Sequence, residues 1–495
     1  MTNIRPLPPS GDERQPAALR ATRPLHPRAG LVWLVLAARL GELRRVGVID
    51  DASFAAVARA LETARDAHGD DGSVADLVAS ITRRAEVVLP AELSGVLSLG
   101  NANEEVAATV LRLTARQAAL GMLSELDALR AALLALADEH TITSMPALLG
   151  DRPAQPTTFA HFLGGVIAPL ATAAARLRQA YADLNRSPIG AGLLSADVIE
   201  VDRHAMATSL GFDMPIANTF DAVANTEDLA AFVAAGVAAV APVRRFVDEL
   251  CLWLRTDPTS LRLADAWLHQ PEPGLPHLTT AGPLRALALA FRTTEGAATA
   301  FLNLVRSLGY GPTGAHVDTL LSQLDDLTAR SCAALGSVAR FVTDGLMVNR
   351  AWLANRAGRG FTTSGDLAAF LMMEESLPPS VAQAIAAKVI TRTMATGAEV
   401  TAIGPAGIDA AALEVIGREV HVEPEALGRA LAPRRFLERR NVAGSPAPER
   451  TRDWLDAERE RLTADRDWRE HERVRLDSVL DALMTTISDA AGQAD

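Results

Sequence analysis

Residues 184–223 read LNRSPIGAGLLSADVIEVDRHAMATSLGFDMPIANTFDAV and connect two long apolar segments. Gly190 and Gly192 closely follow Pro188, which indicates a loop whose backbone needs conformations that other residues rarely adopt. The pair Asp202-Arg203 and then Asn218 come later, each next to apolar residues. The stretch therefore predicts a shaped loop between two helices.

Three segments around this loop have the periodicity of long amphipathic helices. Each is roughly 25 residues long, which exceeds the usual helix of a globular protein and is typical of a helical bundle. Small residues dominate 230–243, AAFVAAGVAAVAPV, so neighbouring helices can approach closely there, and Pro242 should kink the helix. The predicted helices are Thr157–Leu184, Asp228–Leu254 and Pro283–Leu308.

Length and composition favour a helical protein of more than one domain. The 495 residues are too many for one core, and 49% are hydrophobic although only 4% are aromatic. The net charge of −12 and the lack of a basic stripe argue against a nucleic-acid partner. The apolar run Gly30–Ala38 is too short to cross a bilayer, so we expect no membrane segment and no export signal.

Two cysteines, Cys251 and Cys332, cannot form a disulfide framework, and we expect a reduced, cytoplasmic protein. Toward the amino terminus, two helices are expected between residues 31 and 64, with Asp51 as the N-cap of the second. Near the carboxyl terminus, residues 463–489 form a charged amphipathic pattern that predicts a helix on the surface.

The order of these features resembles the argininosuccinate lyase family of the fumarase/aspartase superfamily. The resemblance rests on 184–223 and on four shorter motifs, and it covers roughly residues 30–462. These motifs are the LxxxGVI pattern from Leu43, RGFTTSGDL at 359–367, Arg439-Arg440, and GSPAP at 444–448.

The resemblance implies an all-α, three-domain fold with a long central helical bundle, assembled as a homotetramer that acts on a small-molecule substrate. Apolar faces as long as those predicted here support the tetramer, because a monomer would expose them. The expected division is a loose arm at 1–28, an N-terminal helical domain at 29–114, a central bundle at 115–358 and a C-terminal helical domain at 359–495.

The loops that carry chemistry in the resembled family are altered in this chain. The family eliminates fumarate from a succinyl-amine, which requires a base, an acid and groups that bind carboxylates. Its Thr-His pair corresponds to Leu149-Gly150, inside a run from Met145 to Pro156 whose two flanks match the family without a gap. Its substrate-binding serine corresponds to Leu36.

Three further loops have also lost their reactive side chains. The carboxylate-binding loop corresponds to 99–105, where only the glycine remains and Glu104-Glu105 add negative charge. The catalytic serine loop falls on 272–281, or on 267–276 in a second register, and neither register supplies its serine or lysine. Lys388 is the only lysine in the chain. The fifth loop falls on 312–320, where Tyr and Lys are lost.

Polar residues that now stand in these loops are candidates for a rebuilt site. His277 is the best candidate for a base, because imidazole titrates near neutral pH, and Glu104 or Asp151 is a candidate to orient it. Arg152 is suited to hold an anionic group. Each of them alone is more often an ordinary surface residue. The catalytic candidates are His277, His316, Glu104 and Asp151, the substrate-binding candidates are Asn101, Asn103, Arg152 and Gln155, and His269 and Asp318 also fall in these loops.

The ten histidines are scattered without metal-binding spacing, and the glycine-rich stretches lack the context of a phosphate loop, so we expect no metal and no cofactor. His161 lies in the sequence FAHFL, which resembles a scaffold motif of the family, and is interpreted as structural.

Three functional hypotheses follow from this pattern. The first is a diverged lyase-superfamily enzyme with a rebuilt active site, which acts on a small biosynthetic intermediate. The second is a catalytically silent scaffold or binding protein. The third is argininosuccinate cleavage itself, which would need unrelated residues to replace every catalytic group. An open cleft lined by the new polar residues would favour the first hypothesis over the second.

Overall fold

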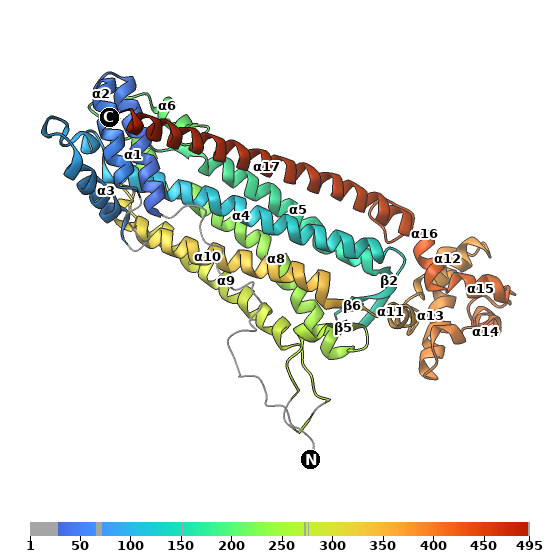
Figure 1. The fold of residues 1–495 in the computed structure, drawn as a ribbon. Coiled ribbons are helices and arrows are strands. Elements are labelled where there is room, and N and C mark those ends of the chain that lie inside the picture. The colour runs from blue at the N-terminus through green and yellow to red at the C-terminus, as the bar shows by residue number, and fades with distance from the viewer. Residues whose placement is uncertain (1–27, 66–71, 151, 272–273, 276, 494–495) are drawn as a thin grey trace, which may run out of the picture.

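The computed structural model describes residues 28–65, 72–150, 152–271, 274–275 and 277–493. Its architecture is all-α, as predicted, with a long helical bundle, a small helical group at one end and a separate helical domain at the other (Figure 1). The expected arm at 1–28 lies outside the described residues except for Arg28, which begins the first helix.

Five long helices, which run alternately up and down the molecule in chain order, form the bundle. The three predicted helices correspond to α5, α8 and α9, with ends that differ from the prediction by at most two residues. α4 and α10 complete the bundle, and α4 packs against both α5 and α10. The bounds are α4 Asn103–Glu139, α5 Phe159–Leu184, α8 Glu227–Thr256, α9 Gly282–Ser307 and α10 Gly314–Arg340.

A group of three helices, with the short turns that follow them, packs around the start of α4; we call residues 28–103 the head. The N-cap of its second helix is Asp50, whose side chain accepts the N–H of Ser53 at 2.8 Å, so the predicted cap at Asp51 was wrong by one residue. The elements are α1 Arg28–Arg45, α2 Asp51–Thr63, α3 Val74–Val88, η2 Ala91–Leu93 and η3 Val96–Ser98. The expected domain boundary at 114/115 lies inside α4, where the helix is continuous.

The connection at 184–223 has the shape that its glycines predict. Gly190 and Gly192 adopt φ angles of 77° and 59°, and a Cβ on Gly190 would lie 2.7 Å from the side chain of Arg203. Fully buried Arg116 of α4 holds this connection through hydrogen bonds to Asn185 Oδ1 at 3.0 Å and to the carbonyl of Leu210 at 3.1 Å. Its elements are β3 Arg186–Ser187, α6 Arg203–Ser209, β4 Met214–Pro215 and α7 Thr219–Ala224, with β3 parallel to β4.

Two small antiparallel sheets lie at the other end of the bundle. The first is the hairpin β1 Ser144–Leu149 with β2 Arg152–Thr158. The second pairs β5 Leu261–Leu263 with β6 Leu346–Val348. Two short helical turns adjoin the second sheet, η4 Asp265–Trp267 and the π-helical η5 Phe341–Gly345. We call residues 140–158 and 257–281 the hairpin end.

The C-terminal region has a hydrophobic core of its own, built around residues such as Leu367, Phe370, Ile385 and Ile408. Glycine or proline stands at the first position of most of its helices. The bounds are α11 Arg350–Ala357, α12 Gly365–Met373, α13 Pro379–Ala395, η6 Val400–Ala402, α14 Pro405–Ile416, α15 Pro424–Ala430 and α16 Pro433–Arg439.

The last helix, α17 Pro448–Gly492, returns from this domain along the whole bundle to the head (Figure 1). It contains the surface helix predicted at 463–489, and it begins 15 residues earlier. One stripe of it packs against α1, α2, α4 and α5, and buries Leu455, Leu462 and Leu480. The helix therefore clamps the head to the bundle.

α5 and α8 are long and apolar enough to cross a membrane by length and composition, although about half of each apolar window is buried inside the fold. Their mutual packing in the bundle is a sufficient reason for this composition. Cys251 is partly buried and Cys332 is buried, and both are free thiols.

Candidate functional site

α4 divides the predicted site residues into two groups. Its 37 residues extend about 55 Å at the usual rise per residue. Asn101, Asn103 and Glu104 lie near its start at the head, whereas Arg152 and Gln155 lie on the hairpin that follows its end. Within one chain the two groups are therefore at opposite ends of the bundle (Figure 1).

At the head, the carboxylates of the predicted site bind the beginnings of helices. Glu104 Oε2 accepts the N–H of Gly314 at 2.7 Å, at the start of α10. Asp318 Oδ1 accepts the N–H of Val74 at 2.9 Å, at the start of α3. Backbone N–H groups at a helix start have no partner within the helix, so a carboxylate there stabilises the helix.

The other predicted residues at the head have exposed or partly exposed side chains. His316, in the first turn of α10, is exposed, as is Asn103. Asn101 is partly exposed and its Nδ2 lies 3.5 Å from the carbonyl of Leu97. The structure thus brings Glu104 to the start of α10, in the same turn as His316. Among the described residues, no catalytic partner is found for the side chain of His316, Asn101 or Asn103.

At the hairpin end, Leu149 is the last residue of β1 and is 79% exposed, and Gly150 follows it in the connection to β2 with φ 65°. Asp151 lies outside the described residues. Arg152 and Gln155 are exposed on β2, and His277 is exposed on the segment that leads to α9. No described hydrogen bond or ion pair joins His277 to Arg152.

A groove of about 930 Å³ lies between η4, α9 and α10, next to this segment. Trp267, Leu287 and Ala334 are among its apolar walls, and His269 and Arg330 are among its polar residues. Trp267 is fixed by an edge-on contact with Phe341 of the π-helical turn, with ring centroids 4.8 Å apart. The volume and mixed lining are those of small-molecule sites.

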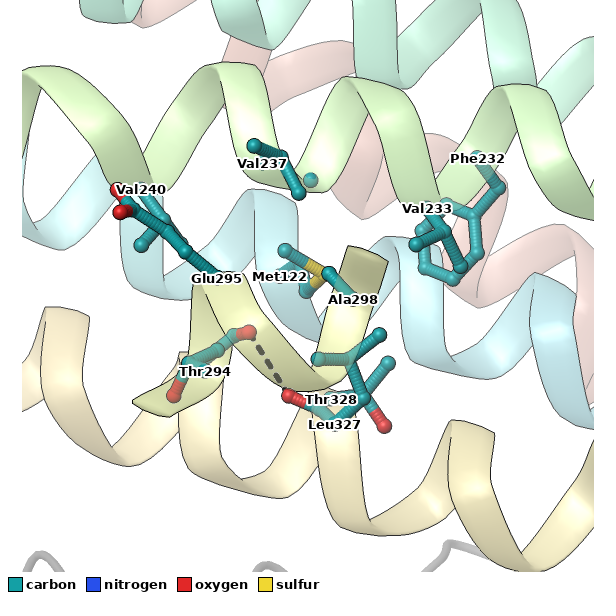
Figure 2. A pocket seen from close by; sticks show the side chains of 12 residues that line it. Met122, Phe232, Val233, Val237, Val240, Thr294, Glu295, Ala298, Leu327 and Thr328 are labelled. Atoms are coloured by element: carbon teal, nitrogen blue, oxygen red, sulfur yellow. Dashed lines mark hydrogen bonds between the residues drawn. The ribbon is translucent and has the colours of Figure 1, made fainter. Parts of the chain in front are cut away.

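A narrow cavity inside the bundle, between α4, α8, α9 and α10, is almost entirely apolar (Figure 2). Met122, Phe232 and Val233 contribute to its wall. The hydroxyls of Thr294 and Thr328 donate to carbonyls of their own helices, so they do not donate hydrogen bonds into the cavity. Its one carboxylate among the described lining residues, Glu295, is paired with Arg244 at 3.0 Å, so the cavity is a gap in core packing.

The sequence reasoning missed a cluster of buried charges at the head. Arg39 of α1 forms an ion pair with Asp197, and the two side chains are only 3% and 2% exposed. Glu105, beside Glu104, is buried and its Oε2 accepts the N–H of Gly192 at 2.7 Å. Burial raises the pKa of Glu105, although the Gly192 N–H and Arg39 act against this increase.

One signal in the sequence pointed to this cluster. Arg39 interrupts an otherwise apolar helix, LVWLVLAARL, and a charge in such a place must find a buried partner. The partner itself could not be identified, because Asp197 lies 158 residues further along the chain.

One group of side chains in the C-terminal domain has the composition of a metal site. Single ligand atoms of Asp409, Glu419 and His421 lie within 4.8 Å of one another, and the last two residues are exposed. Asp409 Oδ1 already accepts the N–H groups of Val420 and His421 at 3.0 and 2.9 Å. The cluster therefore has a structural use as a cap on the turn at 420–421.

Comparison with known proteins gives the relatives of this fold. A family model described as lyase matches residues 55–266. An argininosuccinate lyase from Methanoculleus marisnigri is 29% identical over 451 residues, which cover 88% of this chain and 87% of the relative. One from Methanosarcina barkeri is 27% identical and covers 85% and 84%. The chain is therefore similar to argininosuccinate lyases over most of its length, and its residues 55–266 match the lyase family model.

Solved structures share most of the fold. EDDS lyase in complex with formate superposes with a TM-score of 0.84 over 97% of this chain and 96% of that chain, at 21% identity. A 3-carboxy-cis,cis-muconate lactonizing enzyme from Pseudomonas putida has a TM-score of 0.68, covers 88% and 95%, and is 18% identical. The chain thus shares the fold of these structures over most of its length.

Proposed function

We propose that this lyase has a rebuilt active site and acts on a small biosynthetic intermediate other than argininosuccinate. The observation that carries the proposal is the groove beside His269, which leaves an open, partly polar space next to the segment that replaces the catalytic serine loop. The pair Leu149-Gly150 supports it as well, because neither residue can transfer a proton where the resembled family has Thr-His.

In this proposal His277 acts as the base, and Arg152 and Gln155 bind the substrate from the hairpin. His316, Glu104, Asn101 and Asn103 belong to the opposite end of the bundle, so they reach the same site only from another chain. Asp151 remains a candidate for orienting the base. Neither a cofactor nor a metal is required by this set of residues.

A homotetramer would bring the two ends together. Its support is a stripe of exposed or half-exposed small residues on α8, at Ala231, Ala234, Ala238 and Ala241, with the spacing of packed helices. α5 presents a similar stripe at Gly165, Ala168, Thr172 and Ala175. Two apolar helices that remain half-exposed in one chain are well suited to pack against further copies.

The proposal is tested by two assays on the same preparation. In the first, purified protein at high concentration is mixed with argininosuccinate and fumarate release is followed by ultraviolet absorbance, with an orthodox argininosuccinate lyase as positive control. We expect no release. Turnover in proportion to the amount of protein would overturn the proposal and favour ordinary argininosuccinate cleavage.

In the second assay, fumarate is incubated with a panel of primary amines other than arginine, and mass spectrometry detects adducts formed in the reverse direction. We expect at least one adduct, whose formation falls about a hundredfold or more in His277→Gln, the usual loss for a general base, and is unchanged in His204→Gln. His204 is an exposed histidine of α6, outside the candidate site.

The second candidate function is a catalytically silent lyase-fold scaffold or binding protein. It is favoured by one observation, the use of Glu104 and Asp318 as helix caps, because residues committed to the fold are not free for chemistry. A folded tetramer that forms no adduct with any amine in the panel, and releases no fumarate, would favour this function over the first.

A further inference from the structure

The segment 193–201 lies over the buried charges at the head, and the carboxylate of its Asp197 points inward. Leu193 and Val198 point outward and are 59% and 92% exposed. Asp197 points the other way and pairs with Arg39, and its Oδ1 also accepts the N–H of Ile199 at 3.1 Å. Gly100 lies against this pair so closely that a Cβ there would collide with both side chains.

Arg39 uses only part of its hydrogen-bonding capacity. Its Nη2 donates to Asp197 and, at 3.2 Å, to the carbonyl of Leu99. Its Nε and Nη1 are buried and have no partner in the described structure. A buried guanidinium normally satisfies its donors, and each unsatisfied one is costly. Nη2, which Asp197 holds, shares one edge of the guanidinium with Nε and the other with Nη1, so a carboxylate that replaces Asp197 can bind either edge in a bidentate manner.

A second arginine of the cluster, Arg203, also has a buried donor without a partner in the described structure. Arg203 donates from Nε to the carbonyl of Ile189 at 3.1 Å, while its Nη2 is buried without a partner in the described structure. The negative charge of Glu105 attracts both guanidinium groups and so opposes the decrease in their pKa that burial causes. The cluster therefore presents unsatisfied donors from two arginines beneath one loop.

The two arginines of this cluster, Arg39 and Arg203, need two negative charges for balance, and Glu105 supplies only one of them. Glu42, the other buried acid nearby, is paired with Arg45 at 2.7 Å. The remaining groups are Arg39 and Arg203 against Glu105, so Asp197 supplies the second negative charge. A ligand carboxylate could take the place of Asp197, but two anions at once would leave an excess of buried negative charge.

We propose that Arg39 and Arg203 form a binding site for a single carboxylate group of the substrate, which Asp197 occupies in the closed state and leaves when the segment 193–201 opens. The proposal rests on the proposed function for the identity of the ligand as substrate. It names the substrate class as a compound one of whose carboxylates binds to these two arginines, because Glu105 already supplies one of the two negative charges that balance them. Asp197 then acts as an internal competitor.

Competition by Asp197 makes a quantitative prediction. A ligand that binds only the open state has its apparent affinity reduced by the fraction of open molecules. Asp197→Asn keeps the size of the side chain but removes its charge, so the open state becomes more populated. Calorimetric titration of the full-length protein with propionate measures this effect. We expect Asp197→Asn to bind propionate at least about tenfold more tightly than the wild type does.

Two controls make the result specific. Ser195→Ala changes an exposed residue of the same segment and should leave the affinity for propionate at the wild-type value. The double variant Asp197→Asn/Arg39→Gln removes both charges of the pair and should lose propionate binding. Equal affinities in the wild type and Asp197→Asn, or binding that persists without Arg39, would overturn the proposal.

Hydrogen exchange on the wild-type protein decides the matter even if Asp197→Asn does not fold. Saturating sodium propionate should accelerate amide exchange in peptides that cover 193–201, relative to sodium chloride at the same ionic strength, while the core around Phe370 and Ile385 stays unchanged. No acceleration would contradict displacement of Asp197. Because neither experiment reads turnover, binding without catalysis would refute the proposed function and leave this site standing.

Discussion

At the scale of single residues, His140 couples stability to pH. It ends α4 with its side chain buried, and its ring contacts the edge of Phe159 at 5.2 Å between centroids. Burial, aided by the positive charge of Arg350, lowers the pKa of His140 to about 4. The unfolded chain binds the proton near pH 6.5, so between these values the unfolded state holds more protons and acidification favours unfolding.

The free energy of unfolding should therefore fall by about 3 kcal/mol through His140 alone as the pH decreases from 7 to 4. His140→Asn retains a polar contact for Thr143 but cannot titrate in this range. Urea denaturation at several pH values should show the stability of the wild type decreasing relative to this variant. The exposed His316, replaced in the same way, serves as the control. An equal pH dependence in the wild type and His140→Asn would refute this account.

At the scale of elements, Arg130 fastens α17 to α4. Its guanidinium is fully buried and binds Asp465 of α17 at 2.7 Å and Asp127 of its own helix at 3.5 Å. Asp127 is bound in turn by Arg469 of α17 at 3.1 Å. Removal of one member of a buried ion pair leaves the partner charge without compensation.

Arg130→Ala should therefore lower the free energy of unfolding by about 3–5 kcal/mol, measured by urea denaturation. Arg330→Ala is the matched control, because Arg330 forms an exposed pair with Asp326 on α10 whose loss costs about 0.5 kcal/mol or less. If the two variants were equally stable, Arg130 would not fasten the two helices.

The caps between helices make a smaller contribution of the same kind. Asp318→Ala deprives the Val74 N–H of its acceptor, so α3 should loosen against α10 at a cost of about 1 kcal/mol. In Asp318→Ala, hydrogen exchange of the Val74 amide should accelerate more than that of the Asp51 amide, which is likewise the first residue of its helix, α2. Unchanged exchange at Val74 would mean that water replaces the carboxylate without loss.

The elements also show what sequence could and could not provide. α5, α8 and α9 were predictable because apolar residues repeat with helical spacing along each, and the glycines at 190 and 192 marked the loop between two of them. The role of Glu104 and Asp318 as helix caps was not predictable, because their carboxylates accept N–H groups that lie 210 and 244 residues away in the chain. Such a long-range contact leaves no local pattern, so polar residues in altered loops suggested chemistry where the structure shows caps.

At the scale of the whole molecule, the length of α4 controls how a site can form. With the residues around Glu104 at one end and the hairpin at the other, one chain leaves each half of the predicted site incomplete. In the proposed tetramer, the exposed small residues of α8 and α5 form the surface through which further copies complete it. A charge placed in that surface should therefore disrupt assembly without unfolding the single chain.

Ala234→Arg tests this surface. Ala234 is exposed in the middle of the α8 stripe, so a long charged side chain there costs little in one chain, but it would be buried unpaired between packed helices, at a cost of several kcal/mol. Sedimentation velocity should show the proposed tetramer for the wild type and smaller species for Ala234→Arg, with unchanged helical circular dichroism. Ala384→Arg, an equally exposed alanine in α13 of the C-terminal domain, should remain tetrameric. If Ala234→Arg also remained tetrameric, the α8 stripe would face solvent and the two halves of the site would have to meet by a different packing of chains.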